Sequence, residues 1–181
     1  MSQWPTDEIR SVPLERLDER FRRYRLVDAV AERAVRRSLE RYGQLAPIVI
    51  WEQDECLVLI DGFKRLQAAR TLKGTETLAA RCLEVDAAAA KAAIYTLNRL
   101  SRPPQELEEA WIVHALVRED GLSQVDAGAL LGRHKSWVNR RLAMWERLAE
   151  AAQEELRLGL LSPTMARQLT RLPVGNQAEA L

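Results

Sequence analysis

The sequence contains few of the residues from which metal and redox sites are built. Its 181 residues include two cysteines, Cys56 and Cys82, and two histidines, His114 and His134. The cysteines show no metal-ligand spacing, so we expect two inert thiols in a reducing compartment. Because a metal-dependent nuclease needs clustered acids and histidines, and both histidines fall in the helical part of the chain, this pattern argues against such an enzyme.

Long apolar runs and a charge excess are also missing. No apolar run approaches the roughly 20 residues that cross a membrane, and the first ten residues, MSQWPTDEIR, contain no apolar signal core. Lys and Arg total 27 against 26 acids, a net charge of +1, so any basic surface must be local. The composition is 47% hydrophobic and 29% charged, which predicts a globular protein that we expect to be cytoplasmic.

The pattern of apolar residues predicts two domains, residues 1–100 and 101–181, with a hinge near residues 101–104. The first domain mixes strands with helices, and the helix at 28–42 is expected to bury a stripe of Val30, Ala34 and Leu39 and to end at Gly43. Its other elements are expected at 8–17, 45–52, 55–62 and 78–85 (strands) and at 63–73 and 87–99 (helices). This order indicates an α+β fold around a small mixed sheet.

The second domain is predicted to be all helical. Helices are expected at 105–120, 123–132 and 135–151, the last with Ser136 as its N-cap. Two short helices are expected within 154–172, and the second begins at Ser162 and Pro163.

Residues 123–147 have the pattern of a helix-turn-helix motif. Ser123 and Asp126 resemble a capping box, residues 132–134 form a short link, and Gly128 allows the two helices to approach closely. The residues expected to face the core are Ala127, Leu130, Leu131, Val138, Leu142 and Trp145. This arrangement predicts DNA binding by the second helix.

The outer face of this motif carries side chains that suit DNA. Asn pairs with adenine, Arg with guanine, and Lys or Ser with phosphate. The predicted DNA-binding residues are Ser123, Gln124, Lys135, Ser136, Trp137, Asn139, Arg140 and Arg141. An ordinary three-helix bundle with one basic helix is the alternative, and Trp137 either packs at the edge of the bundle or contacts the DNA backbone.

A second candidate site lies in LVLIDGFKRLQAARTLKG, residues 57–74, where a buried strand turns tightly into a helix. Gly62 opens the helix, whose free N–H groups, with Lys64 and Arg65, would attract an anion such as a nucleotide phosphate. The alternative is a tight turn with a solvated basic face. Asp61 either assists a metal or caps the turn. The segment is not a Walker P-loop.

Six segments in one order resemble the ParB family of partition proteins over residues 9–172. The segments are IRSVPLERL, RSLERYGQLAPIVI, IDGFKRLQAAR, LNRLSRPPQELEEAW, GLSQVDAGALLGRHKSWVNRRLAMWERL and GLLSPTMARQL. The third resembles the phosphate-binding box of the family, and the fifth resembles its DNA-binding segment. The resemblance implies a sulfiredoxin-like N-terminal domain followed by a helix-turn-helix domain.

The resemblance implies a CTP-gated DNA clamp. Such a protein binds a palindromic site on double-stranded DNA as a homodimer, takes CTP with Mg²⁺, and serves plasmid or chromosome partition with a partition ATPase, or serves a mobile element. It would be associated with the nucleoid or a plasmid. The nucleotide-binding residues carried over to this sequence are Gln44, Pro47, Gly62, Phe63, Lys64, Arg65, Ala68 and Asn98.

The sequence departs from the family's pattern at Phe63, Lys64, Gln67 and Leu97, and near Ser101 where the family carries an Arg. Phe63 replaces a Glu of the box, Lys64 replaces an Arg that it does not match as a bidentate donor, and Leu97 stands where members that hydrolyse CTP carry a Glu. We therefore predict weakened or absent hydrolysis, and assign no catalytic or metal-binding residue. The alternatives are a transcriptional regulator with a degenerate N-terminal domain that binds no nucleotide, and an enzyme on the sulfiredoxin-like scaffold. The family's C-terminal dimerisation domain has no counterpart before Leu181, so other domains or a longer chain would have to supply dimerisation.

Overall fold

The chain folds into two compact units, Met1–Ile94 and Tyr95–Leu181. The computed structural model describes residues 8–101 and 105–179. The division between the units falls within helix α3 (Ala87–Ser101), whereas the predicted domain boundary lies after residue 100. The predicted hinge falls partly on residues 102–104, which lie outside the described residues.

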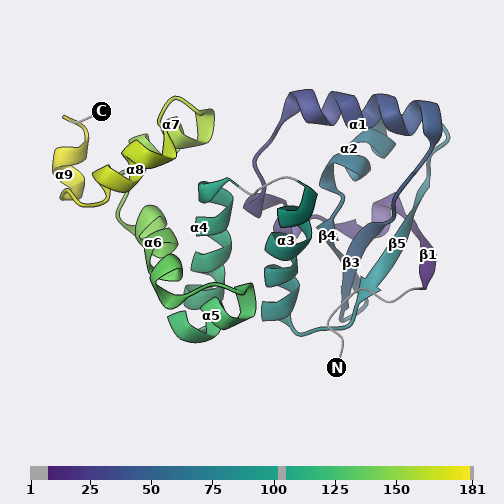
Figure 1. Cartoon of the computed structure of the whole chain (residues 1–181). Coiled ribbons are helices and arrows are strands. Elements are labelled where there is room, and N and C mark those ends of the chain that lie inside the picture. The colour runs from purple at the N-terminus through teal and green to yellow at the C-terminus, as the bar shows by residue number, and fades with distance from the viewer. Residues whose placement is uncertain (1–7, 102–104, 180–181) are drawn as a thin grey trace. The chain divides into compact units, whose positions relative to one another are not determined.

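The first unit contains a five-stranded mixed sheet (Figure 1). Its strands are β1 (Ile9–Pro13), β2 (Leu17–Asp18), β3 (Ile48–Gln53), β4 (Cys56–Asp61) and β5 (Thr77–Leu83). They lie in the order β1-β5-β3-β4-β2, and the β1–β5 and β3–β4 pairs are antiparallel while the β5–β3 and β4–β2 pairs are parallel. The predicted mixed sheet is confirmed.

The β3–β4 hairpin forms the centre of this sheet. The runs Ile48–Trp51 and Leu57–Ile60 are buried throughout, which explains why both strands read as continuous apolar runs and not as alternating ones. Asp54 and Glu55 form the turn with φ of 48° and 67°. Positive φ at both central residues matches the twist of a two-residue hairpin, so the predicted turn is confirmed.

Helix α1 (Ala29–Tyr42) packs against α2 (Phe63–Thr71) in the first unit (Figure 1). The Asp28 carboxylate accepts the N–H of Ala31 at 3.0 Å and starts α1, and Gly43 ends it as predicted. The predicted buried stripe of Val30, Ala34 and Leu39 is wrong. No residue of α1 is buried, and Val30 is 69% exposed, because α1 packs mainly against the short helix α2. Two 3₁₀ helices, η1 (Leu14–Arg16) and η2 (Arg20–Tyr24), precede it.

The second unit is helical wherever the structure describes it, as predicted. Its elements are α4 (Glu106–His114) with a π-helical turn η3 (Ala115–Glu119), α5 (Gln124–Leu131), α6 (Lys135–Glu146), α7 (Glu150–Leu158), α8 (Pro163–Leu169) and α9 (Val174–Gln177). Ser162 caps α8 as predicted, since its hydroxyl accepts the N–H of Met165 at 3.2 Å. The sequence did not predict α9, whose buried Gln177 accepts the N–H of Ala149 and donates to the carbonyl of Arg147, both at 2.7 Å.

The core of the second unit lies between α4, α5 and α6. It contains Leu107, Ala110, Val113, Ala127, Leu131, Val138, Leu142 and Met144, all at most 3% exposed. Helix α6 packs most extensively against α4 and also contacts α5 and α8, while its first two turns leave polar side chains exposed. Across the described part of the chain, none of the helices has the length and apolar character needed to cross a bilayer.

Candidate nucleic-acid interface and anion site

Helices α5 and α6 are joined by a turn of three residues, 132–134, as the sequence predicts. The hydroxyl of Ser123 caps α5 by accepting the N–H of Asp126 at 3.1 Å and donates to the Asp126 carboxylate at 2.6 Å. Gly132 ends α5 in the left-handed conformation. Because the Ser123 hydroxyl is already engaged in this cap, its predicted contact with DNA stays a prediction.

Gly128 is the point of closest approach between α5 and the turn. A Cβ atom at this position would lie 2.6 Å from the backbone carbonyl oxygen of Arg133 and 3.4 Å from a methyl group of Val138. No side chain larger than hydrogen fits there without moving the turn. The predicted need for a small residue is therefore confirmed, and the atom that imposes it is a carbonyl of the turn.

The N-cap of helix α6 is His134 and not Ser136. The backbone of His134 is extended, and its Nδ1 accepts the N–H of Ser136 at 3.2 Å. The predicted Ser136 N-cap is wrong because the imidazole supplies the acceptor two residues earlier. The Ser136 hydroxyl lies 2.9 Å from the same Nδ1.

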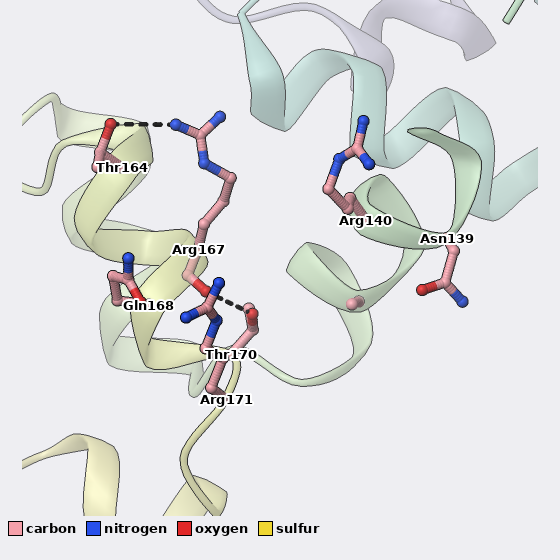
Figure 2. A pocket seen from close by; sticks show the side chains of 8 residues that line it. Asn139, Arg140, Thr164, Arg167, Gln168, Thr170 and Arg171 are labelled. Carbon is pink, nitrogen blue, oxygen red and sulfur yellow. Dashed lines mark hydrogen bonds between the residues drawn. The ribbon is translucent and has the colours of Figure 1, made fainter. Parts of the chain in front are cut away.

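The first two turns of α6 present polar and cationic side chains to solvent. Lys135, Ser136, Asn139 and Arg140 are exposed, and Figure 2 shows Asn139 and Arg140 projecting from the helix. The Nδ2 of Asn139 donates to the side-chain Oε1 of Gln124, at the start of α5, at 3.5 Å. These groups are donors and acceptors of the kind that contact phosphates and base edges.

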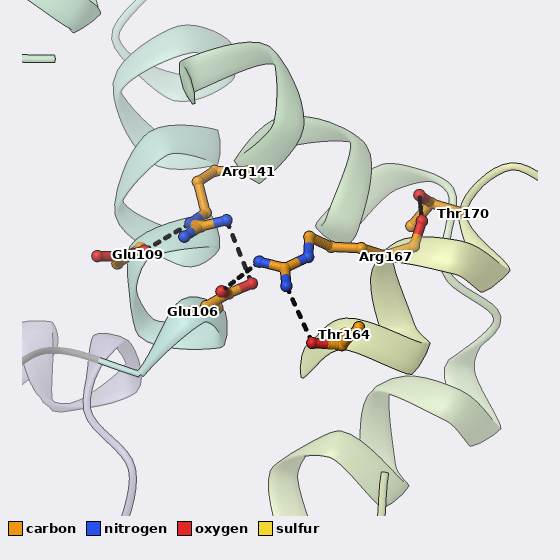
Figure 3. Close-up of polar contacts among 6 residues, drawn as sticks. All are labelled: Glu106, Glu109, Arg141, Thr164, Arg167 and Thr170. Carbon is orange, nitrogen blue, oxygen red and sulfur yellow. Dashed lines mark hydrogen bonds and ion pairs between the residues drawn. The ribbon is translucent and has the colours of Figure 1, made fainter. Parts of the chain in front are cut away.

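Arg141 lies inside the unit and not on the outer face of α6. It is 7% exposed, and its Nε donates to Glu109 at 2.5 Å while Nη1 donates to Glu106 at 3.2 Å (Figure 3). The predicted place of Arg141 on the DNA-facing surface is wrong, because two acids three residues apart on α4 draw its guanidinium inward. No local sequence pattern connects Arg141 with these acids, which lie 32 and 35 residues away in the chain.

Trp137 packs within the unit. Its ring lies 5.7 Å from the ring of Tyr95, and the guanidinium groups of Arg133 and Arg141 lie 5.3 Å and 5.2 Å from its centre. These distances suit cation–π contacts, so of the two interpretations of Trp137 the geometry favours packing. Arg133 also donates from Nε to the Tyr95 hydroxyl at 2.6 Å, which ties the turn between α5 and α6 to α3.

An ion-pair network beneath α6 links three helices of the second unit. Glu106 of α4 accepts from Arg141 of α6 and, at 2.7 Å, from Arg167 of α8 (Figure 3). Burial raises the pKa of Glu109, and the nearby charge of Arg141 opposes that rise. The sequence analysis did not identify Glu106, Glu109 or Arg167 as parts of this network, because no local pattern connects residues on different helices.

The strand-turn-helix at 57–74 has a geometry that suits an anion. Gly62 has φ of 106°, and a Cβ there would lie 2.5 Å from a methyl carbon of Ile48, so only glycine fits. No side chain caps the start of α2. The N–H groups of the first turn of a helix have no partner within the helix, and they favour negative charge.

Arg65 connects this turn to the predicted nucleotide loop. Its Nη1 donates to the carbonyls of Ala46 and Pro47 at 2.7 Å and 2.5 Å, and its Nη2 donates to the Asp61 carboxylate at 2.7 Å. The Gln44 amide donates to the same Ala46 carbonyl at 3.0 Å and also bonds to Ala79. The structure thus brings Gln44, Pro47 and Arg65 together, but the donors of Arg65 are already engaged.

The other residues predicted to bind a nucleotide lie in different surroundings. Lys64 lies 3.8 Å from Asp28, while Phe63 and Ala68 are buried. Asn98 is buried on α3 in the second unit, and Leu97 is half-buried beside it. Arg22 of η2, which the sequence analysis did not single out, also lies near the start of α2. Its guanidinium lies 5.9 Å from the centre of the Phe63 ring and pairs with Glu32 at 2.7 Å. Its only sequence signal is the basic run RFRRYR, residues 20–25.

Residues 8–101 and 105–179 contain no group of three or more His, Cys, Asp or Glu side chains arranged to hold a metal ion. Asp61, the acid nearest the start of α2, pairs with Arg65. This residue therefore stabilises the turn, which is one of the two roles considered for it from the sequence.

Comparison with known proteins finds similarity in structure. No family model and no curated protein sequence matches the chain. The C-terminally truncated chromosome-partitioning protein ParB from Caulobacter crescentus, complexed to the centromeric parS site, is 21% identical with a TM-score of 0.56, over 94% of this chain and 90% of that chain. A pNOB8-like ParB N-domain is 14% identical with a TM-score of 0.53, over 99% of each chain.

A third structure, the same truncated Caulobacter crescentus ParB complexed with CTP-gamma-S, is 21% identical with a TM-score of 0.47, over 95% of this chain and 98% of that chain. The first two likenesses show that this chain has the fold of truncated ParB proteins. The fold expected from the resemblance, a mixed-sheet unit followed by a helical one, is confirmed.

Proposed function

We propose that this protein binds double-stranded DNA with α5 and α6 acting as a helix-turn-helix, and that α6 reads base edges in the major groove. The observation that carries the proposal is the division of α6 into two faces. Val138, Arg141 and Leu142 are buried, whereas Lys135 and Asn139 are exposed in its first two turns. The N-terminal part of a recognition helix is the part that reaches base edges in this motif.

The likeness in fold supports the same function. The Caulobacter crescentus ParB structure of the same fold is complexed to a centromeric DNA site. By the sequence resemblance, we propose a palindromic target bound by a homodimer, and a role in plasmid or chromosome partition with a partition ATPase, or in a mobile element. Such a protein would be found with the nucleoid or a plasmid.

We further propose that the start of α2 takes the phosphates of a nucleotide, CTP by the resemblance. The first-turn N–H groups and Lys64 fit a phosphate, since the ion pair of Lys64 with Asp28 is long at 3.8 Å. The start of α2 fits Mg²⁺ poorly, because its one nearby acid in the sequence, Asp61, is paired with Arg65. By the resemblance, Leu97 also stands where a carboxylate is expected. We therefore propose binding at this site without hydrolysis.

One observation favours the second candidate function, a regulator whose first unit binds no nucleotide. Cations near the start of α2 have partners within the first unit: Arg22 pairs with Glu32, Lys64 with Asp28, and Arg65 with Asp61. A nucleotide would have to displace these carboxylates. In this second function the DNA-binding role of α6 is unchanged.

Selection of duplexes from a randomised library by the full chain tests the DNA-binding function. The expected result is one enriched motif, palindromic if the protein binds as a dimer. Asn139→Ala should then lower affinity for the enriched duplex by about 1–3 kcal/mol and alter the preference at one or two positions. Val125→Ala is the matched control, because Val125 is 58% exposed on α5 and carries no polar group. Failure to enrich any motif, with equal affinity for unrelated duplexes, would contradict sequence-specific recognition.

A further inference from the structure

A cleft between α6 and α8 lies beside the proposed reading face. Its volume is about 390 Å³, and it is lined by Asn139 and Arg140 from α6 and by Thr164, Arg167 and Gln168 from α8, with Arg171 just beyond the end of α8. Figure 2 shows Arg140 on one side of the cleft and Arg167 on the other. This volume is larger than that of a phosphodiester group.

Three guanidinium groups line this cleft and no carboxylate does. Arg167 has partners, since it donates to Glu106 at 2.7 Å and to the Thr164 hydroxyl at 3.1 Å. The side chains of Arg140 and Arg171 form no hydrogen bond or ion pair with any residue that the structure describes. Two cations without acidic partners line one cleft and create a local positive potential. The net charge of the whole chain, +1, does not reveal this potential.

The walls of the cleft are held in place by contacts outside it. Glu106 of α4 accepts from both Arg141 of α6 and Arg167 of α8, so one carboxylate fixes the two helices relative to α4 (Figure 3). Ser162 caps the start of α8. An anion that enters would therefore meet two helices whose positions are already set, so binding would order only the Arg140 and Arg171 side chains.

We propose that this cleft binds a phosphate of the DNA backbone, with Arg140 and Arg171 as its ligands, next to the bases that α6 reads. The inference rests on the proposed DNA-binding function and extends the interface from α5 and α6 to α8. It also changes the role of Arg140 from reading guanine to contacting the backbone. Guanidinium groups bind phosphate oxygens in a bidentate manner, and contacts of this kind position a protein without carrying sequence information.

The test compares two single-charge variants of the full chain, Arg171→Gln and Arg147→Gln, on the selected duplex and on an unrelated one at several salt concentrations. Arg147 is the matched control because it is exposed at the end of α6 and does not line the cleft. Arg171→Gln should weaken binding to both duplexes by the same factor, roughly fivefold to tenfold at 0.1 M salt. It should also reduce the slope of log K against log salt by about 0.9, the loss of one phosphate contact. Arg140→Gln should do the same and leave the preference between duplexes unchanged.

The outcomes separate the two proposals. If Arg171→Gln behaves like Arg147→Gln while Asn139→Ala loses the sequence preference, α6 reads DNA and the cleft proposal is overturned. If Arg140→Gln lowers affinity for the selected duplex alone, Arg140 reads a base and its phosphate role is overturned. If the unaltered chain binds neither duplex at low salt, the DNA-binding function and the cleft proposal both fail.

Discussion

The Nε of Arg141 in α6 donates to the carboxylate of Glu109 in α4 at 2.5 Å, and both residues are only 7% exposed. This buried pair holds the proposed recognition helix against α4. The cost of burying two charges is offset here by close geometry and by the second acceptor, Glu106. In the proposed DNA-binding function, this pair would act by positioning α6 and would not touch DNA.

Arg141→Met should destabilise the second unit strongly. Removing the cation leaves the Glu109 carboxylate buried without its partner, which typically costs about 3–5 kcal/mol. Urea denaturation followed by circular dichroism measures the free energy of unfolding. Arg157→Met is the control, because Arg157 forms an exposed ion pair with Glu154 on α7, and its loss should change stability little. If Arg141→Met were as stable as the unaltered chain but bound DNA poorly, the structural role would be contradicted.

The contribution of Glu109 to the stability of the folded chain should decrease as pH rises. Because burial raises its pKa in the folded state, the folded chain binds a proton more tightly at this site than the unfolded chain does. The contribution to stability is then fully present below the ordinary carboxyl pKa, about 4.3, and is lost as pH rises through the raised value. Glu109→Gln, which resembles the protonated acid, should remove this dependence.

The measurement for Glu109 is the difference in unfolding free energy between the unaltered chain and Glu109→Gln at several pH values. Taking the difference cancels the pH dependence that other carboxylates contribute. Glu146 is one of these: its hydrogen bond with Arg118 lowers its pKa, so its contribution to stability changes with pH in the opposite direction. The stability of the unaltered chain relative to the variant should decline as pH rises from about 4 toward 7. A relative stability that increased over this range would show that the Arg141 charge outweighs burial.

The sequence predicted those features that local chemistry controls. The Asp54–Glu55 turn, the Ser123 and Ser162 caps and the glycine at position 128 each depend on a few neighbouring residues, and each is confirmed. The order of strands and helices follows from the same local signals. The predicted DNA-facing positions Lys135, Asn139 and Arg140 follow from helical periodicity alone, and all three are exposed.

The features that the sequence did not predict depend on distant partners. Periodicity suggested that Arg141 faces outward, but two acids on α4, 32 and 35 residues away in the chain, bring it inside. The apolar residues of α1 suggested burial, yet α1 packs mainly against α2 and leaves Val30 exposed. In the same way, the cleft between α6 and α8 combines residues whose proximity only the tertiary fold establishes.

Gly128→Ala should displace the turn between α5 and α6. The added Cβ would lie 2.6 Å from the Arg133 carbonyl oxygen, a backbone atom that cannot move aside alone, so we expect a loss of about 1–3 kcal/mol in stability. Affinity for the selected duplex should fall as well, because the turn positions α6. The control is Gly175→Ala in α9, where no atom lies within 4 Å of the new Cβ. Thermal unfolding and fluorescence anisotropy measure the two effects, and a Gly128→Ala chain as stable as Gly175→Ala would contradict the expected clash.

Lys64→Gln should weaken nucleotide binding without affecting DNA binding. If the start of α2 holds a triphosphate, Lys64 exchanges Asp28 for a phosphate oxygen, and its loss should cost about 1.5 kcal/mol, or roughly tenfold in affinity. Because the pair with Asp28 is partly exposed, stability should change by less than about 1 kcal/mol.

Isothermal titration calorimetry with CTP, ATP and GTP, with and without the selected duplex, measures binding. Lys73→Gln is the matched control, since Lys73 is exposed beyond the end of α2. Heat released by the unaltered chain with CTP, and reduced only by Lys64→Gln, would support the nucleotide site. No heat with any of the three nucleotides would rule out the nucleotide site and favour the regulator. In that case the carboxylates paired with Arg22, Lys64 and Arg65 would already neutralise the cations that a triphosphate needs.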